Sequence, residues 1–381
     1  MRSKKLIILL VLSLLLTGCP EKKVLDQLGI INARGIDVEN EDDKMKVNFV
    51  IFQFEEQSQN ITKIVSGKGS TVNGALHDAN YETNFLLQHG KIQIDLYGKE
   101  TAEKGIQPLL DSLNRDPNTP DTMFLAVSNT TAEDILTVQE QNISMNIGQF
   151  LHDTIEKSTK TDNLFPQVTL QKFMLFLEDV GRDPILPIFT LKEGVPKITS
   201  IGVFKTDKLV GELPIKNVKL INILYHRVKQ AWIEVSIPIE PFQDELKDEV
   251  MKQQEDISLN FSIKKNKSNT KLIDKENLKF ETNIKLNVNL IESSVYESLN
   301  MEDVHIVKKL EDEIEKKLEK RYDDMLKYLQ EVNSDVLSYG AVYRQNNREH
   351  RLKKSEWRKL FPNIDVKYNI DVNLIQSGES L

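Results

Sequence analysis

Two segments near the C-terminus alternate between hydrophobic and polar residues, the pattern of a β-strand with one buried face. They cover residues 280–290 and 364–374. Between them, residues 301–332 carry hydrophobic residues at the three- and four-residue spacing of an amphipathic helix, which would extend for about 45 Å. Because the spacing follows 3.6 rather than 3.5 residues per turn, we expect the helix to pack on a sheet and not in a coiled coil.

The N-terminal half has shorter elements. Strand patterns over 45–54, 91–97 and 123–127 alternate with helical patterns that begin after position 70, at 101 and at 131. Strands that alternate with helices predict an α/β domain.

The domain organisation follows from where these patterns change. The proline- and glycine-containing segment 183–197 is the best candidate for a boundary. We therefore expect a mixed α/β (α+β) multidomain protein. Its expected parts are a signal peptide (1–18), an N-terminal α/β domain (19–190), a middle domain (197–255) and a C-terminal domain (256–381) that includes the helix 301–332. Residues 264–271 are expected to form a basic loop between strands.

Composition supports a protein with real hydrophobic cores. The 381 residues are 39% hydrophobic and 28% charged, which excludes collagen-like, disulfide-rich and wholly disordered classes. The net charge is −8, without a basic face, so nucleic-acid binding is not expected, because phosphate neutralisation dominates such binding.

The N-terminus has the pattern of a bacterial lipoprotein signal. Basic residues within the first five positions precede a mostly apolar run over 6–16, which is too short to span a membrane as a helix. The lipobox Leu16, Thr17, Gly18, Cys19 follows. Small residues at Thr17 and Gly18 give a peptidase access to the bond before Cys19, whose thiol accepts a lipid.

Cys19 is the only cysteine of the chain, so an internal disulfide is excluded. We expect cleavage after residue 18, which takes the net charge from −8 to −11, and an S-diacylglyceryl and an N-acyl (palmitate-type) group on Cys19. Two or three acyl chains give stable membrane anchoring. The alternatives are an ordinary secretory signal with an incidental cysteine, or an uncleaved anchor. The mature body is expected on the outer face of the cell membrane.

Candidate catalytic and metal-binding residues are few. The glycine-rich segment 66–71 lacks the spacing of a phosphate loop and is better explained as a turn with a helix N-cap. The pairs His77-Asp78 and His152-Asp153 are neighbours on helices and are not expected to face each other. Nucleophile-elbow, zinc and calcium motifs are absent from the sequence. We expect no catalytic residue, no metal site and no cofactor.

The charge pattern of residues 308–317 offers several pairs of opposite charge at a four-residue spacing. It fits either a partner-binding face or a solvated helix face, and the solvated face is the preferred interpretation.

The order of these features resembles the Ger(x)C family, the lipoprotein C subunits of nutrient germinant receptors in spore-forming bacteria. The resemblance follows the lipobox along nearly the whole mature chain. It is carried by residues 31–37, Gly69, His89, 105–111, 115–116, 165–170, 181–187, 201–204 with Asp207 and Lys208, 335–340 and 357–361.

The resemblance implies a three-domain protein on the outer surface of the spore inner membrane. There it would act with two integral-membrane subunits in sensing nutrients and triggering spore germination. It also implies a protein that is not an enzyme, in agreement with the motif search. The alternative function is a solute-binding lipoprotein of a transporter, which shares the lipobox and the α/β character.

Overall fold

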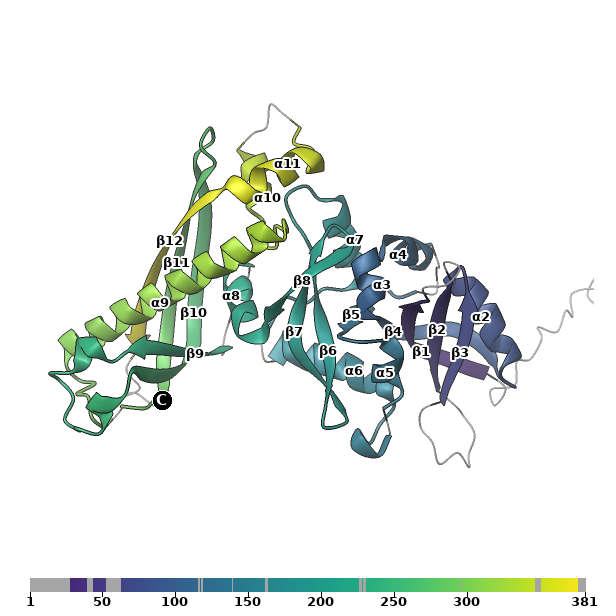
Figure 1. The fold of residues 1–381 in the computed structure, drawn as a ribbon, viewed down its shortest axis with the longest axis horizontal. Coiled ribbons are helices and arrows are strands. Elements are labelled where there is room, and N and C mark those ends of the chain that lie inside the picture. The colour runs from purple at the N-terminus through teal and green to yellow at the C-terminus, as the bar shows by residue number, and fades with distance from the viewer. Residues whose placement is uncertain are drawn as a thin grey trace, which may run out of the picture.

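The computed structural model describes residues 28–375, except 40–43, 53–62, 116, 118, 139, 162–163, 226–227, 229–230, 296 and 347–350. These residues form two bodies side by side, each built around one sheet (Figure 1). The mixed α/β multidomain class expected from the sequence is confirmed.

The first body contains an eight-stranded sheet with the order β3-β2-β1-β4-β5-β6-β7-β8. Its centre, β1-β4-β5-β6, is parallel, and antiparallel strands extend both edges. All five residues of β5 are buried, as expected for a parallel strand with both faces covered. The strands are β1 (Leu28–Val38), β2 (Met45–Phe52), β3 (Lys63–Gly69), β4 (Leu86–Tyr97), β5 (Phe124–Ser128), β6 (Ile185–Lys192), β7 (Val195–Lys205) and β8 (Lys208–Pro214).

Helices form at the places that the sequence predicted, with one break, and at two further places, 147–156 and 170–178. The expected helix from position 101 is divided, because Gly105 takes a φ of +115° and Pro108 stands in the first turn of the next helix. Thr131 caps α5 through a capping box with Asp134. The helices are α2 (Val72–Tyr81), α3 (Lys99–Lys104), α4 (Gln107–Asn114), α5 (Ala132–Leu136), α6 (Ile147–Glu156) and α7 (Leu170–Glu178).

The segment 183–197 is not a linker in the structure. It forms most of a hairpin in which β6 and β7 pair antiparallel around a tight turn. Glu193 and Gly194 both take positive φ in that turn, 55° and 74°. The eight-stranded sheet therefore runs across the boundary expected at 190–197. The expected middle domain, 197–255, is divided: β7 and β8 belong to the first sheet, while β9 belongs to the second.

The second body contains a four-stranded sheet with the order β12-β11-β10-β9. The alternating segments expected as strands are confirmed, and β11 and β12 pair in parallel in one register over their whole overlap. The basic segment 264–271 is part of β10 and not a loop, because it pairs with β11. The strands are β9 (Ala231–Pro238), β10 (Asp256–Asp274), β11 (Lys279–Ser293) and β12 (Asp365–Ile375).

The remaining helices connect or cover the two sheets. They are α8 (Ile215–Tyr225), α9 (Val304–Glu331), α10 (Tyr339–Gln345) and α11 (Lys354–Leu360). Short turns of 3-10 or π-helix complete the list: η2 (Glu140–Asn142), η3 (Lys157–Thr161), η4 (Glu240–Phe242), η5 (Met251–Gln253) and η6 (Phe361–Asn363).

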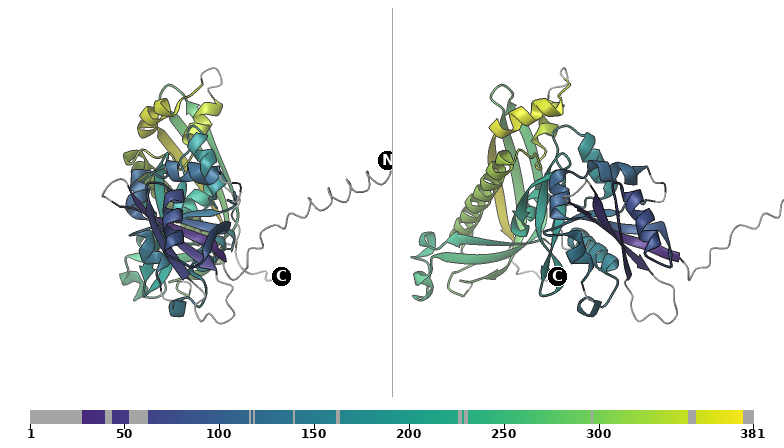
Figure 2. Two further views of the ribbon diagram at one scale, coloured as in Figure 1. Left: turned by 90° about the vertical axis from the view of Figure 1, so that its right-hand side faces the viewer. Right: turned by 45° about the vertical axis from the view of Figure 1, so that its right-hand side comes forward.

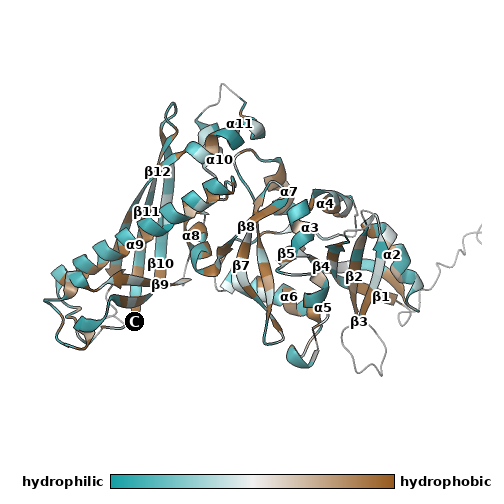
Figure 3. Ribbon diagram, viewed as in Figure 1, coloured by the Kyte–Doolittle hydropathy of each residue, from teal (hydrophilic) through white to brown (hydrophobic). Residues whose placement is uncertain are grey.

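Helix α9 matches the long amphipathic helix expected from the sequence, and it lies along the second sheet as Figure 2 shows. Its hydrophobic stripe is buried against the sheet, while much of its ribbon in Figure 3 has the colour of hydrophilic residues. The charged face includes exposed pairs such as Lys308 with Asp312 at 3.0 Å.

One row of α9 side chains has a role that the charge pattern did not reveal. Glu311, Glu315 and Glu319 accept hydrogen bonds from the backbone N–H groups of Leu374, Val372 and Ile370 at 2.8, 2.9 and 3.4 Å. These N–H groups point outward from the edge strand β12. The row thus covers backbone donors that would otherwise be available to another strand.

Candidate functional site at the junction of the two sheets

The proposed anchor lies outside the described part of the chain. This holds for the lipobox residues Leu16, Thr17 and Gly18 and for Cys19. Lipidation of Cys19 therefore stays a prediction from the sequence. Within the described ranges, none of the helices combines the length and hydrophobicity needed to cross a membrane.

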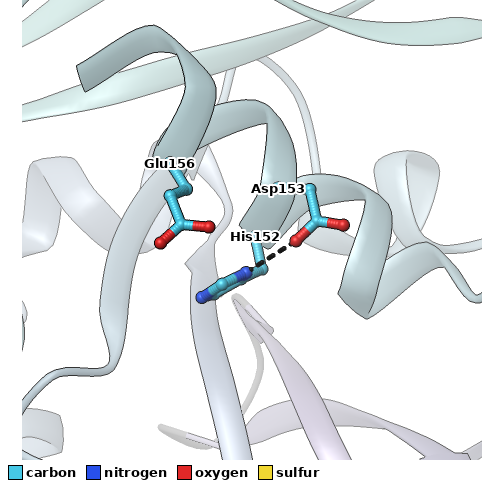
Figure 4. A group of neighbouring side chains, drawn as sticks. All are labelled: His152, Asp153 and Glu156. Atoms are coloured by element: carbon cyan, nitrogen blue, oxygen red, sulfur yellow. Dashed lines mark hydrogen bonds and ion pairs between the residues drawn. The ribbon is translucent and has the colours of Figure 1, made fainter. Parts of the chain in front are cut away.

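The two histidine–aspartate pairs differ from each other. His77 is exposed on α2, and the Asp78 carboxylate accepts a hydrogen bond from Lys68 N at 2.8 Å. On α6, however, His152 Nδ1 lies 2.9 Å from Asp153 Oδ1 (Figure 4). The expectation that neighbouring helix residues do not meet is wrong for this second pair, because the two side chains bend toward each other along the helix surface.

Glu156 joins this pair, so that possible ligand atoms of His152, Asp153 and Glu156 all lie within 4.8 Å of one another. Both carboxylates already have protein partners. Asp153 accepts a hydrogen bond from Gln149 Nε2 at 2.7 Å, and Glu156 pairs with Lys160. The group is a partly exposed polar network on α6 and gives no ground for assigning an ion to it.

A buried polar network lies where the two bodies meet, and it joins segments far apart in the sequence. Asp183, in the loop between α7 and β6, is paired through both carboxylate oxygens with the guanidinium of Arg358 on α11. The same carboxylate accepts bonds from Asp335 N at 2.7 Å and Thr206 N at 3.0 Å. Its side chain is 2% exposed, against 18% for Arg358. Asp183 thus receives four donors from three separate segments.

Asp335, just after α9, is the second carboxylate of the network. It is fully buried and accepts bonds from Tyr339 N at 3.0 Å, Gly340 N at 2.7 Å and Trp357 Nε1 at 2.9 Å. Burial raises the pKa of Asp335 to about 7 and the nearby Asp183 adds to the rise, while the three N–H donors oppose it.

This raised pKa links the junction to pH. The folded-state value lies above the ordinary 3.8, so between about pH 4 and 7 the folded chain holds a proton that the unfolded chain has lost. The contribution of Asp335 to stability is therefore greatest below about pH 4. It falls as the pH rises to about 7 and is then constant.

The backbones of two segments touch directly at this point. A Cβ on Gly181 would lie 2.2 Å from the carbonyl carbon of Gly340, and Gly181 takes a φ of +86°. A Cβ on Gly340 would in turn lie 2.5 Å from Trp357 Nε1. Ala341 N donates to the carbonyl of Gly181 at 3.2 Å. Only glycine allows this approach.

Further bonds attach the C-terminal segments to the first body and to α8. Tyr225 at the end of α8 bonds to Ser338 Oγ at 2.6 Å, and Ser334 Oγ donates to the Phe204 carbonyl at 2.6 Å. On the surface, Arg344 of α10 pairs with Asp179 at the end of α7. The carboxylates and hydroxyls named above all have hydrogen-bond partners, and such an arrangement suits a rigid connection between the two sheets.

The segments that form the junction are among those that carry the family resemblance, but the sequence does not predict that they meet. The structure brings together four of the segments that carry the resemblance; they contain Asp183, Phe204, Asp335 and Trp357. The sequence offered no local signal that would pair them, because Asp183 and Asp335 are two of 58 acidic residues.

Comparison with known proteins assigns most of the chain. Residues 21–191 match the family described as spore germination protein N-terminal domain, and residues 199–378 match the spore germination B3/GerAC-like C-terminal family. Spore germination protein GerQC of Bacillus cereus is 24% identical over 379 residues, covering 98% of this chain and 99% of that protein. A crystal structure of the GerBC protein shares the fold, with a TM-score of 0.54 at 17% identity, over 92% of this chain and 100% of that chain. The chain belongs to the Ger(x)C family of spore germination proteins.

Proposed function

We propose that this protein is the lipid-anchored C subunit of a germinant receptor in the spore inner membrane and that nutrient-triggered germination requires it. It is held at the outer face of that membrane by Cys19. It acts by assembly with two integral-membrane receptor subunits and catalyses no reaction.

The observation that carries this proposal is the extent of the family match. The two germination families together span 21–191 and 199–378, which is nearly everything after the proposed cleavage site. Lipid tethering supports the assembly part of the proposal, because it confines the body to a thin layer at the membrane and raises its effective concentration near membrane subunits.

The fold favours this function over a solute-binding lipoprotein of a transporter, which usually has two similar lobes. The two sheets of this chain differ in strand number and in order, and in the second a parallel strand pair is connected through the long helix α9.

Gene deletion followed by measurement of dipicolinate release tests the proposal. We expect the response to the nutrients of this receptor to be lost, while a trigger that bypasses nutrient receptors still releases dipicolinate. If every nutrient response persists after paralogous receptors have also been removed, the receptor function is wrong and the solute-binding function becomes the better explanation.

The anchor is tested separately by Cys19→Ala, which removes the only thiol of the chain. Mass spectrometry should find an unlipidated precursor in the variant and a lipidated mature chain in the wild type. A cleaved, lipid-free chain from wild-type cells would refute the anchor.

The non-catalytic role is tested by His77→Ala and His152→Ala. Both variants should keep the germination response at normal protein levels. A folded variant without a response would indicate chemistry at that histidine.

A further inference from the structure

A cavity of about 510 Å³ lies beside the polar network at the junction. It is bounded by the segment before α7, one face of α7, the start of β6, the end of α8 and the segment after α9. Its size lies within the range of roughly 300–1,000 Å³ that is typical of small-molecule sites. The walls are mainly apolar, with side chains of Pro166, Val168, Leu175, Phe176, Ile185 and Val336.

Several charged groups at this cavity are already neutralised. Asp183 is paired with Arg358, and Asp179 is paired with Arg344. These two pairs have little capacity left for a ligand. Lys172 Nζ donates to the Gln167 carbonyl at 3.0 Å and keeps its charge, and Glu178 is a further carboxylate of the lining.

Arg182 differs from them. Its Nε is shielded from solvent, and among the described residues no acceptor lies within hydrogen-bond distance of it. Arg182 forms an ion pair with Asp179, whose Oδ2 atom is 3.8 Å from Nε, a distance too long for a hydrogen bond. The Arg182 side chain as a whole lines the cavity and is 38% exposed, so an acceptor that a ligand brings into the cavity can reach the guanidinium.

We propose that this cavity binds a small organic carboxylate with an apolar body. The carboxylate accepts from the Arg182 guanidinium, whose planar fork matches carboxylate geometry. The apolar body lies against Leu175, Phe176 and Ile185. Because Tyr225 and Val336 line the same cavity, the ligand also touches segments of the junction, so that binding stabilises the joined arrangement of the two bodies.

The site goes beyond the proposed receptor function and is tested on the purified full-length protein in detergent. The probes are 3-phenylpropionate and octanoate, each compared with its uncharged amide, and acetate serves as a carboxylate without an apolar body. Titration calorimetry should give a Kd of about 1 mM for 3-phenylpropionate, given its roughly eleven non-hydrogen atoms. The amides and acetate should bind at least about tenfold more weakly, since a charge-assisted hydrogen bond or the apolar contact is missing.

Three variants locate the site. Arg182→Gln should weaken carboxylate binding about tenfold and leave amide binding unchanged. Arg115→Gln, at an exposed arginine far along the chain, should change neither. Leu175→Trp fills the mouth of the cavity at a side chain that is 58% exposed, so it should weaken both carboxylate and amide without disturbing the core.

Two results would overturn the proposal. One is that neither carboxylate binds wild-type protein at about 10 mM, which would mean that an apolar side chain of a partner protein is the better occupant. The other is that Arg182→Gln, with a wild-type melting temperature, binds 3-phenylpropionate as well as wild type does.

Discussion

Substitution of Arg358 by methionine tests the energetics of the junction. The change keeps an unbranched apolar stem but removes two of the four donors to Asp183. Only the N–H groups of Thr206 and Asp335 remain as donors to a carboxylate whose side chain is 2% exposed. Breaking a buried pair in this way is destabilising by about 3–5 kcal/mol.

The matched control is Arg344→Met. Arg344 pairs with Asp179 at the same junction, but the two side chains are 41% and 25% exposed, so solvent screens the pair and its loss should matter by about 0–1 kcal/mol. For a unit of about 150–250 residues, 1 kcal/mol corresponds to about 2–4 °C. We therefore expect Arg358→Met to lower the melting temperature by roughly 6–20 °C and Arg344→Met by less than about 4 °C.

Fluorescence during urea unfolding reports on this region directly. The chain has two tryptophans; Trp357 is buried in the network, whereas Trp232 is 51% exposed. Adding Asp183→Asn to Arg358→Met should recover part of the lost stability, since it removes the uncompensated charge. The reasoning is refuted if Arg358→Met and Arg344→Met unfold at the same urea concentration, or if the double variant is no more stable than Arg358→Met alone.

Three further changes have defined outcomes. Asp335 lowers the free energy of unfolding as the pH rises from about 4 to 7, and Asp335→Asn should abolish this part of the fall. The variant should be less stable overall. If the free energy of unfolding from urea titrations depends on pH in the variant as it does in the wild type, the raised pKa is contradicted. Gly181→Ala should lower stability by about 2 kcal/mol or more in the same assay, because of the clash with Gly340 and the positive φ. The control Gly90→Ala should be close to neutral, because a Cβ there would lie 3.7 Å from its nearest neighbour. Equal effects of the two changes would argue against the close approach of Gly181 and Gly340. Glu315→Ala should lower the stability of the protein by about 1 kcal/mol, because the N–H of Val372 on β12 loses its acceptor, and Glu315→Gln should lower it by less. An equal loss of stability in both variants would assign the effect to the charge and not to the hydrogen bond.

The elements with strict periodicity were predictable from the sequence, and those set by partners far along the chain were not. The alternation at 280–290 and 364–374 and the helix pattern at 301–332 each reflect one buried face, so the local sequence is sufficient. The segment 183–197 shows the opposite case. Its proline and glycine residues indicate a break in helix, but whether the break is a linker or a hairpin depends on β5 and β8, which pair on either side.

The site follows the same division. The candidate anchor can be named from the sequence because a lipobox is a contiguous motif. Asp183 cannot be paired with Arg358 in advance, since 58 acidic and 50 basic residues offer far too many combinations. The polar, basic composition of the segment 264–271 predicts a loop, yet its cross-strand partners on β11 hold it in β10. Lysine and asparagine are weak strand formers, so this strand depends on its partner.

The glutamate row on α9 has a consequence for how long a strand edge one helix can protect. Four residues of helix advance by about 6.0 Å, and two residues of parallel strand advance by about 6.6 Å. The two periods nearly coincide, and the mismatch of about 0.6 Å accumulates with every step along the pair. The hydrogen bonds lengthen in that order, from 2.8 Å at Glu311 through 2.9 Å at Glu315 to 3.4 Å at Glu319. A straight helix and an edge strand therefore drift out of register with every contact along the pair, as the longer bond of Glu319 illustrates.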